Sequence, residues 1–135
     1  MIVMSKKKVR IGIIGLGFMG STHWRIYKEM KGAEIVAIAD VNAAKRAGDI
    51  SKVVANIGGG DNSKPLDLGN ARIYKTGLEL IADPEVDVVD ICVPTSDHAA
   101  LVSAALAAGK HVFCEKPITV NYALSKEMAD EAEKQ

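Results

Sequence analysis

A glycine motif near the start of the chain is the strongest chemical signal in the sequence. Gly15, Gly17 and Gly20 fit the pattern G-x-G-x-x-G between an apolar run at 9–14 and a segment of helical periodicity. In a strand–turn–helix context this pattern indicates dinucleotide binding. Gly15 would permit a tight turn, Gly17 would let the backbone approach the pyrophosphate, and Gly20 would let the helix pack closely on the strand. The first helical residues, Phe18 and Met19, complete the predicted phosphate site, because free N–H groups at a helix N-terminus favour an anion. A glycine turn without a ligand is the alternative.

An acidic residue follows at the distance that the motif requires. Asp40 closes the apolar run 34–39, twenty residues after Gly20, where an acid accepts hydrogen bonds from the adenosine ribose hydroxyls. A carboxylate there would repel a 2′-phosphate, so we expect NAD, with NADP as the alternative. Lys45 and Arg46 would soften that preference unless they are only solvated helix residues. Asp40 could instead, or in addition, cap the helix that follows it.

Apolar runs alternate with helical patterns along the chain. The runs predict strands at 9–14, 34–39, 72–74, 86–93 and 111–114, and the patterns predict helices at 18–31, 42–56, 77–82, 96–108 and 119–134. Expected helix caps are Asn42, Thr95 or Ser96, and Thr119, and expected stops are Gly32 and Gly109. Residues 57–70 are expected to form a loop, and Gly58–Gly60 within it lack the flanking strand and helix of a phosphate site. Alternation of this kind predicts a parallel sheet with right-handed crossovers. We expect a doubly wound α/β domain of Rossmann type, with strand order 3-2-1-4-5.

Two further segments should lie at the ligand-binding edge of this sheet. Ligands bind beyond the carboxyl ends of parallel strands, where the strand order reverses. Pro94 and Thr95 follow the fourth predicted strand, and Glu115 and Lys116 follow the fifth. These segments should flank the nicotinamide half of a dinucleotide.

The sequence also resembles a known family. The segments that carry the likeness are IGIIGLGFMG (11–20), IVAIAD (35–40), LIADPEVDVVDICVP (80–94) and HAALVSAALAAGKHVFCEKP (98–117). Together they resemble the glucose–fructose oxidoreductase, inositol dehydrogenase and rhizopine-catabolism (Gfo/Idh/MocA) family, over nearly the whole chain from Val9. The resemblance implies hydride transfer between a nicotinamide cofactor and a sugar, polyol or related hydroxyl. It also implies a second, substrate-binding α/β domain that this chain lacks, and the parent protein is expected to be a homo-oligomer.

The same resemblance implies roles for individual residues. It places Lys116 beside the nicotinamide and the substrate hydroxyl as the catalytic lysine, His98 near the cofactor, and a cis peptide before Pro117. Taken alone, Lys116 could be a surface lysine that ends a strand, and Glu115 could orient Lys116, contact the cofactor or serve the fold. A neutral His98 in the first turn of its helix could bond a ligand or lie on the surface.

The remaining aromatic, histidine and cysteine residues are not expected to take part in chemistry. We expect Trp24 to lie in the core and His23 to serve packing rather than chemistry, and His111 is assigned no role. Cys92 and Cys114 lie in apolar runs without metal-ligand spacing. They are expected to be reduced core residues of a cytoplasmic protein.

Composition narrows the function classes. The 135 residues suit one domain; 48% are hydrophobic, 25% are charged, and the net charge is zero. That balance gives no electrostatic support for nucleic-acid binding, and no apolar run approaches the length of a membrane span. The basic run Lys6-Lys7-Lys8, followed by Arg10, is interpreted as part of a solvated leader expected over 1–8. The first residues, Met1 to Met4, are too few for a signal peptide.

Two rival functions remain at this stage. The same fold could serve a non-catalytic nicotinamide-nucleotide sensor or co-regulator, against which Lys116 argues. An S-adenosylmethionine methyltransferase shares a glycine loop and an acid, but the glycine spacing and the Glu-Lys-Pro triplet at 115–117 argue against it. Because the substrate wall is missing, we expect the isolated chain to be inactive and to expose apolar surface that promotes self-association.

Overall fold

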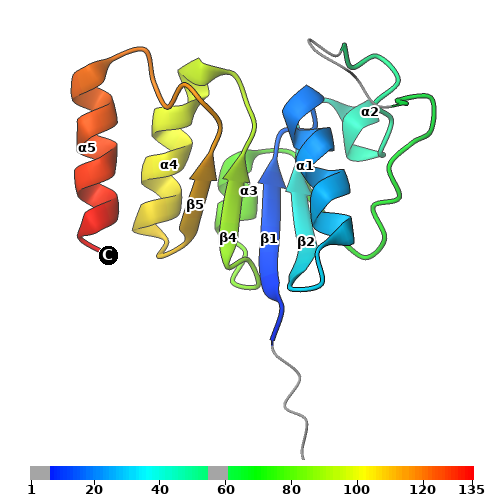
Figure 1. Cartoon of the computed structure of the whole chain (residues 1–135), viewed down its shortest axis with the longest axis horizontal. Coiled ribbons are helices and arrows are strands. Elements are labelled where there is room, and N and C mark those ends of the chain that lie inside the picture. The colour runs from blue at the N-terminus through cyan, green and yellow to red at the C-terminus, as the bar shows by residue number, and fades with distance from the viewer. Residues whose placement is uncertain (1–6, 55–60) are drawn as a thin grey trace, which may run out of the picture.

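The computed structural model describes residues 7–54 and 61–135. One parallel sheet runs through the molecule in the order β3-β2-β1-β4-β5, which confirms the predicted topology (Figure 1). The strands are β1 (Val9–Ile14), β2 (Ala33–Ala39), β3 (Arg72–Tyr74), β4 (Val88–Ile91) and β5 (His111–Cys114). The strand order reverses at β1, which pairs with β2 on one side and β4 on the other. The loops that follow these strands therefore open toward one edge of the sheet.

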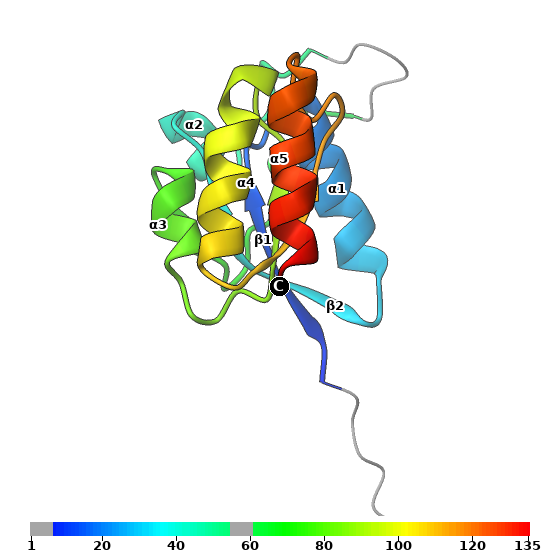
Figure 2. The ribbon, with the colours of Figure 1, turned by 90° about the vertical axis from the view of Figure 1, so that its left-hand side faces the viewer.

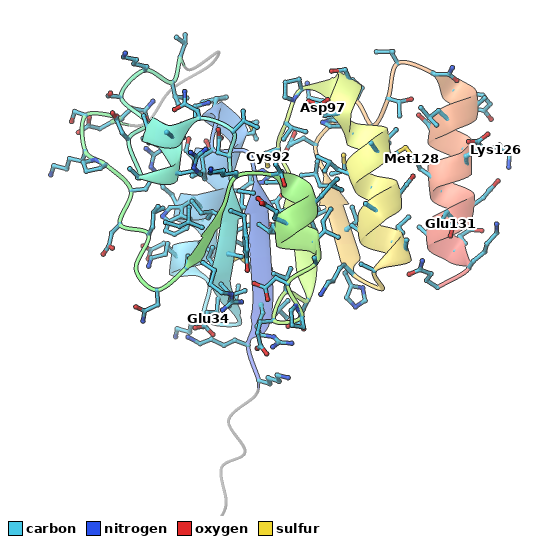
Figure 3. The ribbon with its side chains drawn as sticks, turned by 180° about the vertical axis from the view of Figure 1, so that it is seen from behind. Glu34, Cys92, Asp97, Lys126, Met128 and Glu131 are labelled. Atoms are coloured by element: carbon cyan, nitrogen blue, oxygen red, sulfur yellow. The ribbon has the colours of Figure 1, made fainter. Side chains whose placement is uncertain are left out.

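Helices cover both faces of the sheet. They are α1 (Phe18–Glu29), α2 (Ala43–Arg46), α3 (Gly77–Ile81), α4 (His98–Ala107) and α5 (Tyr122–Glu133), and a single 3₁₀ turn, η1 (Thr95–Asp97), precedes α4. Figure 2 shows α1 on one face and α3 with α4 on the other. α5 lies beside α4: Met128 is buried between these two helices, whereas Lys126 points outward (Figure 3).

A separate hydrophobic core fills each side of the sheet. On the α1 side, Trp24 packs on strand residues such as Ile13 and Ile38, which confirms that Trp24 is a core residue. On the other side, α3, α4 and α5 contribute Leu80, Val102 and Met128. Burial of such side chains contributes about 1.5–3 kcal/mol each relative to exposure. The two cores hold α1 and α4, whose N-termini face the ligand-binding edge.

The helix predicted at 42–56 is much shorter in the structure. α2 ends at Arg46, although Asn42 caps it as predicted, accepting hydrogen bonds from the N–H groups of Ala44 and Lys45. The reason is Gly48, whose φ of +87° turns the chain and whose missing Cβ leaves room for the carbonyl oxygen of Leu66. The turn brings Ile50 into a fully buried position. Residues 55 and 56 lie outside the described residues, as do Gly58–Gly60.

Other predicted boundaries also need correction. α5 begins at Tyr122 rather than at Thr119, because Asn121 caps it by accepting from the N–H of Leu124. Neither Thr95 nor Ser96 caps α4: both lie in η1, and α4 starts at His98. α1 ends at Glu29, where the backbone of Met30 becomes extended, and α3 ends one residue early, at Ile81.

Two strands also differ from their predicted bounds. The fourth strand covers only 88–91, the part that pairs with β1 and β5, and the second strand begins one residue early, at Ala33. Gly109, with φ of +70°, follows α4 as predicted.

Cysteines, apolar side chains and lysines lie at or near the surface of the domain. Cys92 and Cys114 are free but half-buried, so they lie at the margin of the core rather than inside it. After β5, several apolar side chains are exposed, among them Val120 and Tyr122, and Phe113 within the strand is exposed as well. Within the described residues, no helix is both long and apolar enough to cross a membrane. Of the leader expected over 1–8, residues 1–6 lie outside the described part of the chain, and Lys7 and Lys8 are exposed.

Candidate functional site

The glycine turn has the geometry that a phosphate site requires. Gly15 has φ of +92°, a conformation that side chains rarely adopt. A Cβ on Gly20 would overlap the carbonyl oxygen of Gly15, so only glycine lets α1 approach the turn this closely. Among the described residues, no side chain caps α1 at Gly17. The first N–H groups of α1, from Phe18 and Met19 onward, are therefore available to an anion.

Asp40 is fixed beside this turn by two backbone hydrogen bonds. Its Oδ2 accepts from the N–H of Leu16 at 2.8 Å, and its Oδ1 accepts from the N–H of Asn42 at 2.8 Å. The side chain is only 9% exposed. Each carboxylate oxygen has a second lone pair, so Asp40 could still accept hydrogen bonds from a ligand. The N-cap of α2 is Asn42, so Asp40 does not have the capping role that the sequence also allowed.

A cleft joins these two features. It has a volume of about 610 Å³ and opens at the carboxyl ends of β1, β2 and β4, with the start of α3 and part of α4 as its far wall. That size lies within the range of small-molecule and cofactor sites, about 300–1,000 Å³. Four residues predicted to bind the cofactor line it: Gly15, Gly17, Asp40 and Pro94. Lys45 also lines it, whereas the guanidinium of Arg46 donates to the carbonyl oxygens of Asp40 and Val41.

His98 lies behind the cleft rather than in it. The ring is 1% exposed; Nε2 lies 2.9 Å from the carbonyl oxygen of Val93, and Nδ1 lies 2.9 Å from that of Pro117. Both nitrogens are therefore engaged by the backbone. This arrangement gives His98 a structural role, in which it ties the segment after β4 to the segment after β5. Thr95, half-buried in η1, is not among the cleft residues.

Glu115 and Lys116 follow β5 at the same edge of the sheet. The N–H of Glu115 donates to the carbonyl oxygen of Ile91, and the Glu115 side chain is held by His23, whose Nε2 lies 3.1 Å from Oε1. Lys116 is exposed. The Lys116–Pro117 peptide bond is cis, as the family resemblance implied.

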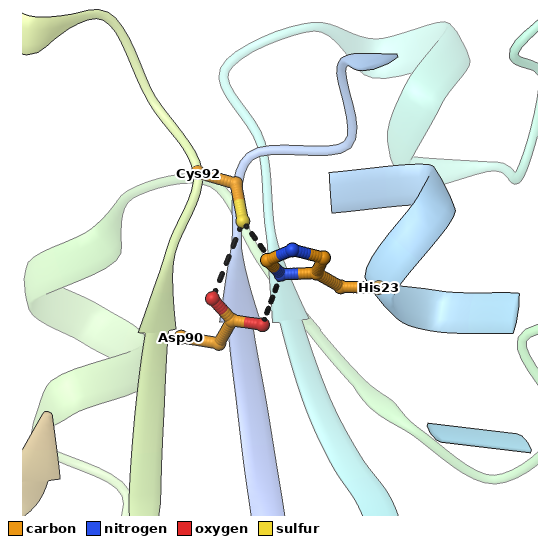
Figure 4. Close-up of side chains that lie close together, drawn as sticks. All are labelled: His23, Asp90 and Cys92. Atoms are coloured by element: carbon orange, nitrogen blue, oxygen red, sulfur yellow. Dashed lines mark hydrogen bonds and ion pairs between the residues drawn. The ribbon is translucent and has the colours of Figure 1, made fainter. Parts of the chain in front are cut away.

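Sequence reasoning missed a group of polar residues between α1 and the ends of β4 and β5. This group, called the His23 cluster, contains His23, Tyr27, Asp90, Cys92 and Glu115. Asp90 is fully buried; its Oδ2 accepts from the hydroxyl of Tyr27 and lies 2.8 Å from Nδ1 of His23, and its Oδ1 lies 3.3 Å from the sulfur of Cys92 (Figure 4). An aspartate inside the apolar run 86–93 was the available signal, because a buried carboxylate needs polar partners.

Three side chains of the cluster lie especially close together. One ligand atom each from His23, Asp90 and Cys92 lies within 4.8 Å of the others. Burial, together with Asp90, raises the pKa of the Cys92 thiol far above its ordinary value. Hydrogen bonds between the three side chains account for their proximity.

Comparison with known proteins identifies the family of the chain. A family model described as "Oxidoreductase family, NAD-binding Rossmann fold" (GFO_IDH_MocA) matches residues 9–135. The chain is 38% identical over 126 residues to a myo-inositol 2-dehydrogenase of Thermotoga maritima, covering 93% of this chain and 33% of that protein. It is 41% identical over 113 residues to an inositol 2-dehydrogenase of Pseudomonas syringae, covering 83% and 30%.

The structural likeness is equally clear. The crystal structure of a probable dehydrogenase from Thermotoga maritima matches with a TM-score of 0.77 and 38% identity, covering 93% of this chain and 33% of that one. The chain thus spans about a third of the length of the curated relatives it matches. Because the family model covers almost all of the chain, the protein belongs to the Gfo/Idh/MocA oxidoreductase family, as an NAD-binding domain of the Rossmann fold.

Proposed function

We propose that this chain binds NAD, with the pyrophosphate at the start of α1 and the adenosine ribose at Asp40, and that it is the cofactor-binding domain of a polyol dehydrogenase. The observation that carries the proposal is the position of Asp40. Its carboxylate lines the cleft and is held to the glycine turn by the N–H of Leu16. Ribose and pyrophosphate sites are thereby fixed relative to each other before any ligand binds, which lowers the cost of binding.

The choice of NAD over NADP rests on charge. A 2′-phosphate would lie next to the Asp40 carboxylate, and two like charges at hydrogen-bonding distance repel each other. Lys45 and Lys75 line the same cleft and would reduce that repulsion. Arg46 is less available, because it donates to backbone carbonyl groups. We therefore propose NAD as the preferred cofactor and a measurable, weaker affinity for NADP.

The proposed reaction uses Lys116, which follows β5 at the same edge of the sheet and is not among the residues that line the cleft. The nicotinamide, when bound, supplies or accepts the hydride. The ammonium of Lys116 would donate a hydrogen bond to the substrate hydroxyl oxygen and stabilise the negative charge that develops there. The names of the relatives, inositol 2-dehydrogenases, support a polyol as substrate. Proton transfer would be shared with a group from the part of the relatives that this chain does not cover.

Isothermal titration of the chain with NAD and with NADP tests the cofactor assignment. Asp40→Ala should weaken NAD binding by about 10–150-fold, the effect of losing hydrogen bonds to a charged group, and should improve NADP binding relative to NAD. Asp40→Asn keeps the side-chain shape and one oxygen acceptor but turns an NH2 group toward the second backbone N–H, so it should lose some stability, which urea unfolding measures, and still bind NAD more weakly. Asp130→Ala on the exposed face of α5 is the control. Unchanged NAD affinity in both Asp40 variants would show that the ribose assignment is wrong.

A further inference from the structure

The His23 cluster connects helix α1, which follows the glycine turn, to strand β4 and to the segment after β5. His23 projects from α1, six residues after Gly17, and reaches strands β4 and β5 on the far side of the point where the strand order reverses. Its two ring nitrogens have different partners. Nδ1 lies 2.8 Å from Oδ2 of Asp90, and Nε2 lies 3.1 Å from Oε1 of Glu115. One side chain therefore joins the helix of the phosphate site to the residue that precedes Lys116.

The identity of these partners determines the protonation of the ring. Ionised carboxylates only accept hydrogen bonds, so each ring nitrogen must donate a proton to its partner. A neutral imidazole has one N–H, and only the imidazolium form has two. The pKa of His23 is raised accordingly, first by the hydrogen bond to Asp90 and then by the charges of Asp90 and Glu115, which together outweigh the effect of burial.

We propose that His23 is a positioning residue: as an imidazolium held by Asp90, it fixes the side chain of Glu115 and thereby the placement of Lys116 beside the proposed nicotinamide site. The inference rests on the proposed role of Lys116. Asp90 is suited to anchor the ring because it is fully buried and also accepts from the hydroxyl of Tyr27 and the thiol of Cys92. Glu115 is the less constrained partner: its side chain is 18% exposed, and the residue lies after the last strand of the sheet.

The environment of His23 makes the link sensitive to pH. Besides the two carboxylates, the titratable groups that face the ring or its partners are the phenol of Tyr27 on α1 and the thiols of Cys92 and Cys114. Burial raises the pKa of all three, that of Cys114 to about 11, so they remain neutral where the ring titrates. Phe113 of β5 contributes only an apolar ring, 5.7 Å from the imidazole centroid.

The sign of the effect follows from the raised pKa. The link is complete below the ordinary histidine pKa of about 6.5, where the ring is charged in the folded and the unfolded chain. It is lost as the pH rises through the higher pKa of the folded state. Above that pH the ring keeps one proton, one of the two hydrogen bonds disappears, and Glu115 is released.

Nitrogen-15 NMR of the histidine rings in the 135-residue chain measures this directly. Both His23 nitrogens should carry protons at pH 6, and the ring should titrate above the ordinary value. The amide resonances of Glu115 and Lys116 should shift with the same midpoint. Glu115→Gln replaces the charged acceptor with a neutral amide at a partly exposed position that the core does not need, and it should lower the midpoint by about one pH unit. His111→Gln removes an exposed histidine at the start of β5 and is the matched control, with no effect on the His23 midpoint.

Amide hydrogen exchange supplies the second readout. In His23→Gln, exchange at Glu115 should be about tenfold faster than in the wild type at pH 6, the scale of one charge-assisted hydrogen bond. That ratio should approach one as the pH rises through the wild-type midpoint. A variant that simply weakened packing would keep a constant ratio at all pH values, and this outcome would contradict the proposal.

Two other results would overturn the inference. A His23 ring with a single proton at pH 6 would mean that the second hydrogen bond comes from a protonated carboxyl group. Displacement of the Nδ1 proton by added Zn²⁺ would assign the cluster to a metal instead. These measurements are made without nucleotide. A chain that failed to bind NAD would therefore contradict the proposed function, and the His23 measurements could still be interpreted.

Discussion

The two halves of the ligand-binding edge are built in different ways. The phosphate half, meaning the turn at 15–20 with Asp40, depends on backbone geometry: a left-handed glycine, a close helix–turn contact and two backbone N–H groups that hold one carboxylate. The lysine half, meaning 93–95 and 115–118, depends on side chains from distant elements, above all His98 and His23. Sites of the first kind are encoded locally, whereas sites of the second kind require the whole fold.

The largest expected effect separates the chemistry of the lysine half from binding at the phosphate half. In a protein that joins this domain to the remaining two thirds of its relatives' length, Lys116→Ala should lower turnover by about 10²–10⁴-fold, the usual contribution of a positioned acid or base. NAD affinity should change little. Lys116→Arg should fail as well, because a planar guanidinium cannot replace a compact ammonium or release its proton. Turnover at saturating substrate and cofactor measures both variants, and activity within a few-fold of the wild type would remove Lys116 from the mechanism.

A medium effect is expected at the phosphate half. Gly20→Ala places a Cβ against the carbonyl oxygen of Gly15 and should lower the free energy of unfolding by about 1–3 kcal/mol, as overpacking does. Alanine within an exposed helix normally stabilises by up to about 1 kcal/mol, so the sign of the change is diagnostic. Gly32→Ala is the control, because nothing lies within 4 Å of the position of its Cβ. Urea unfolding provides the measurement, and a stabilised Gly20→Ala variant would contradict the close contact.

The smallest effect is expected behind the lysine half. His98→Gln replaces a ring that lies between the carbonyl oxygens of Val93 and Pro117 with an amide that cannot reach both, so the free energy of unfolding should fall by about 0.5–1.5 kcal/mol, the net value of one hydrogen bond. Hydrogen exchange should accelerate over 115–120 and stay unchanged over 15–20. The same method would reveal an error here: uniform acceleration across the chain would mean that His98 supports the core and not this segment.

The same contrast explains what the sequence could predict. The glycine spacing, Asp40 and the alternation of strands and helices are local patterns, and they led to the strand order and to the cleft residues Gly15, Gly17 and Asp40. The length of the second helix was predicted wrongly, because helical periodicity continues past Gly48, whereas the positive φ of Gly48 turns the chain and brings Ile50 into the core. His23 was assigned to packing because its partners, Asp90 and Glu115, are 67 and 92 residues away, and no spacing rule connects them.

The three glycines of the turn also differ in what they would reveal to a mutational screen. Gly15 and Gly20 are required by the folded backbone itself, through a positive φ and a direct contact. At Gly17 a Cβ would meet nothing within 4 Å, and the φ of −75° is open to any residue. A library selected for stability alone would therefore keep many residues at 17 and only glycine at 15 and 20, whereas a library selected on immobilised nucleotide would keep glycine at all three. The residue frequencies at position 17 would therefore report the requirement of ligand binding separately from the requirement of folding.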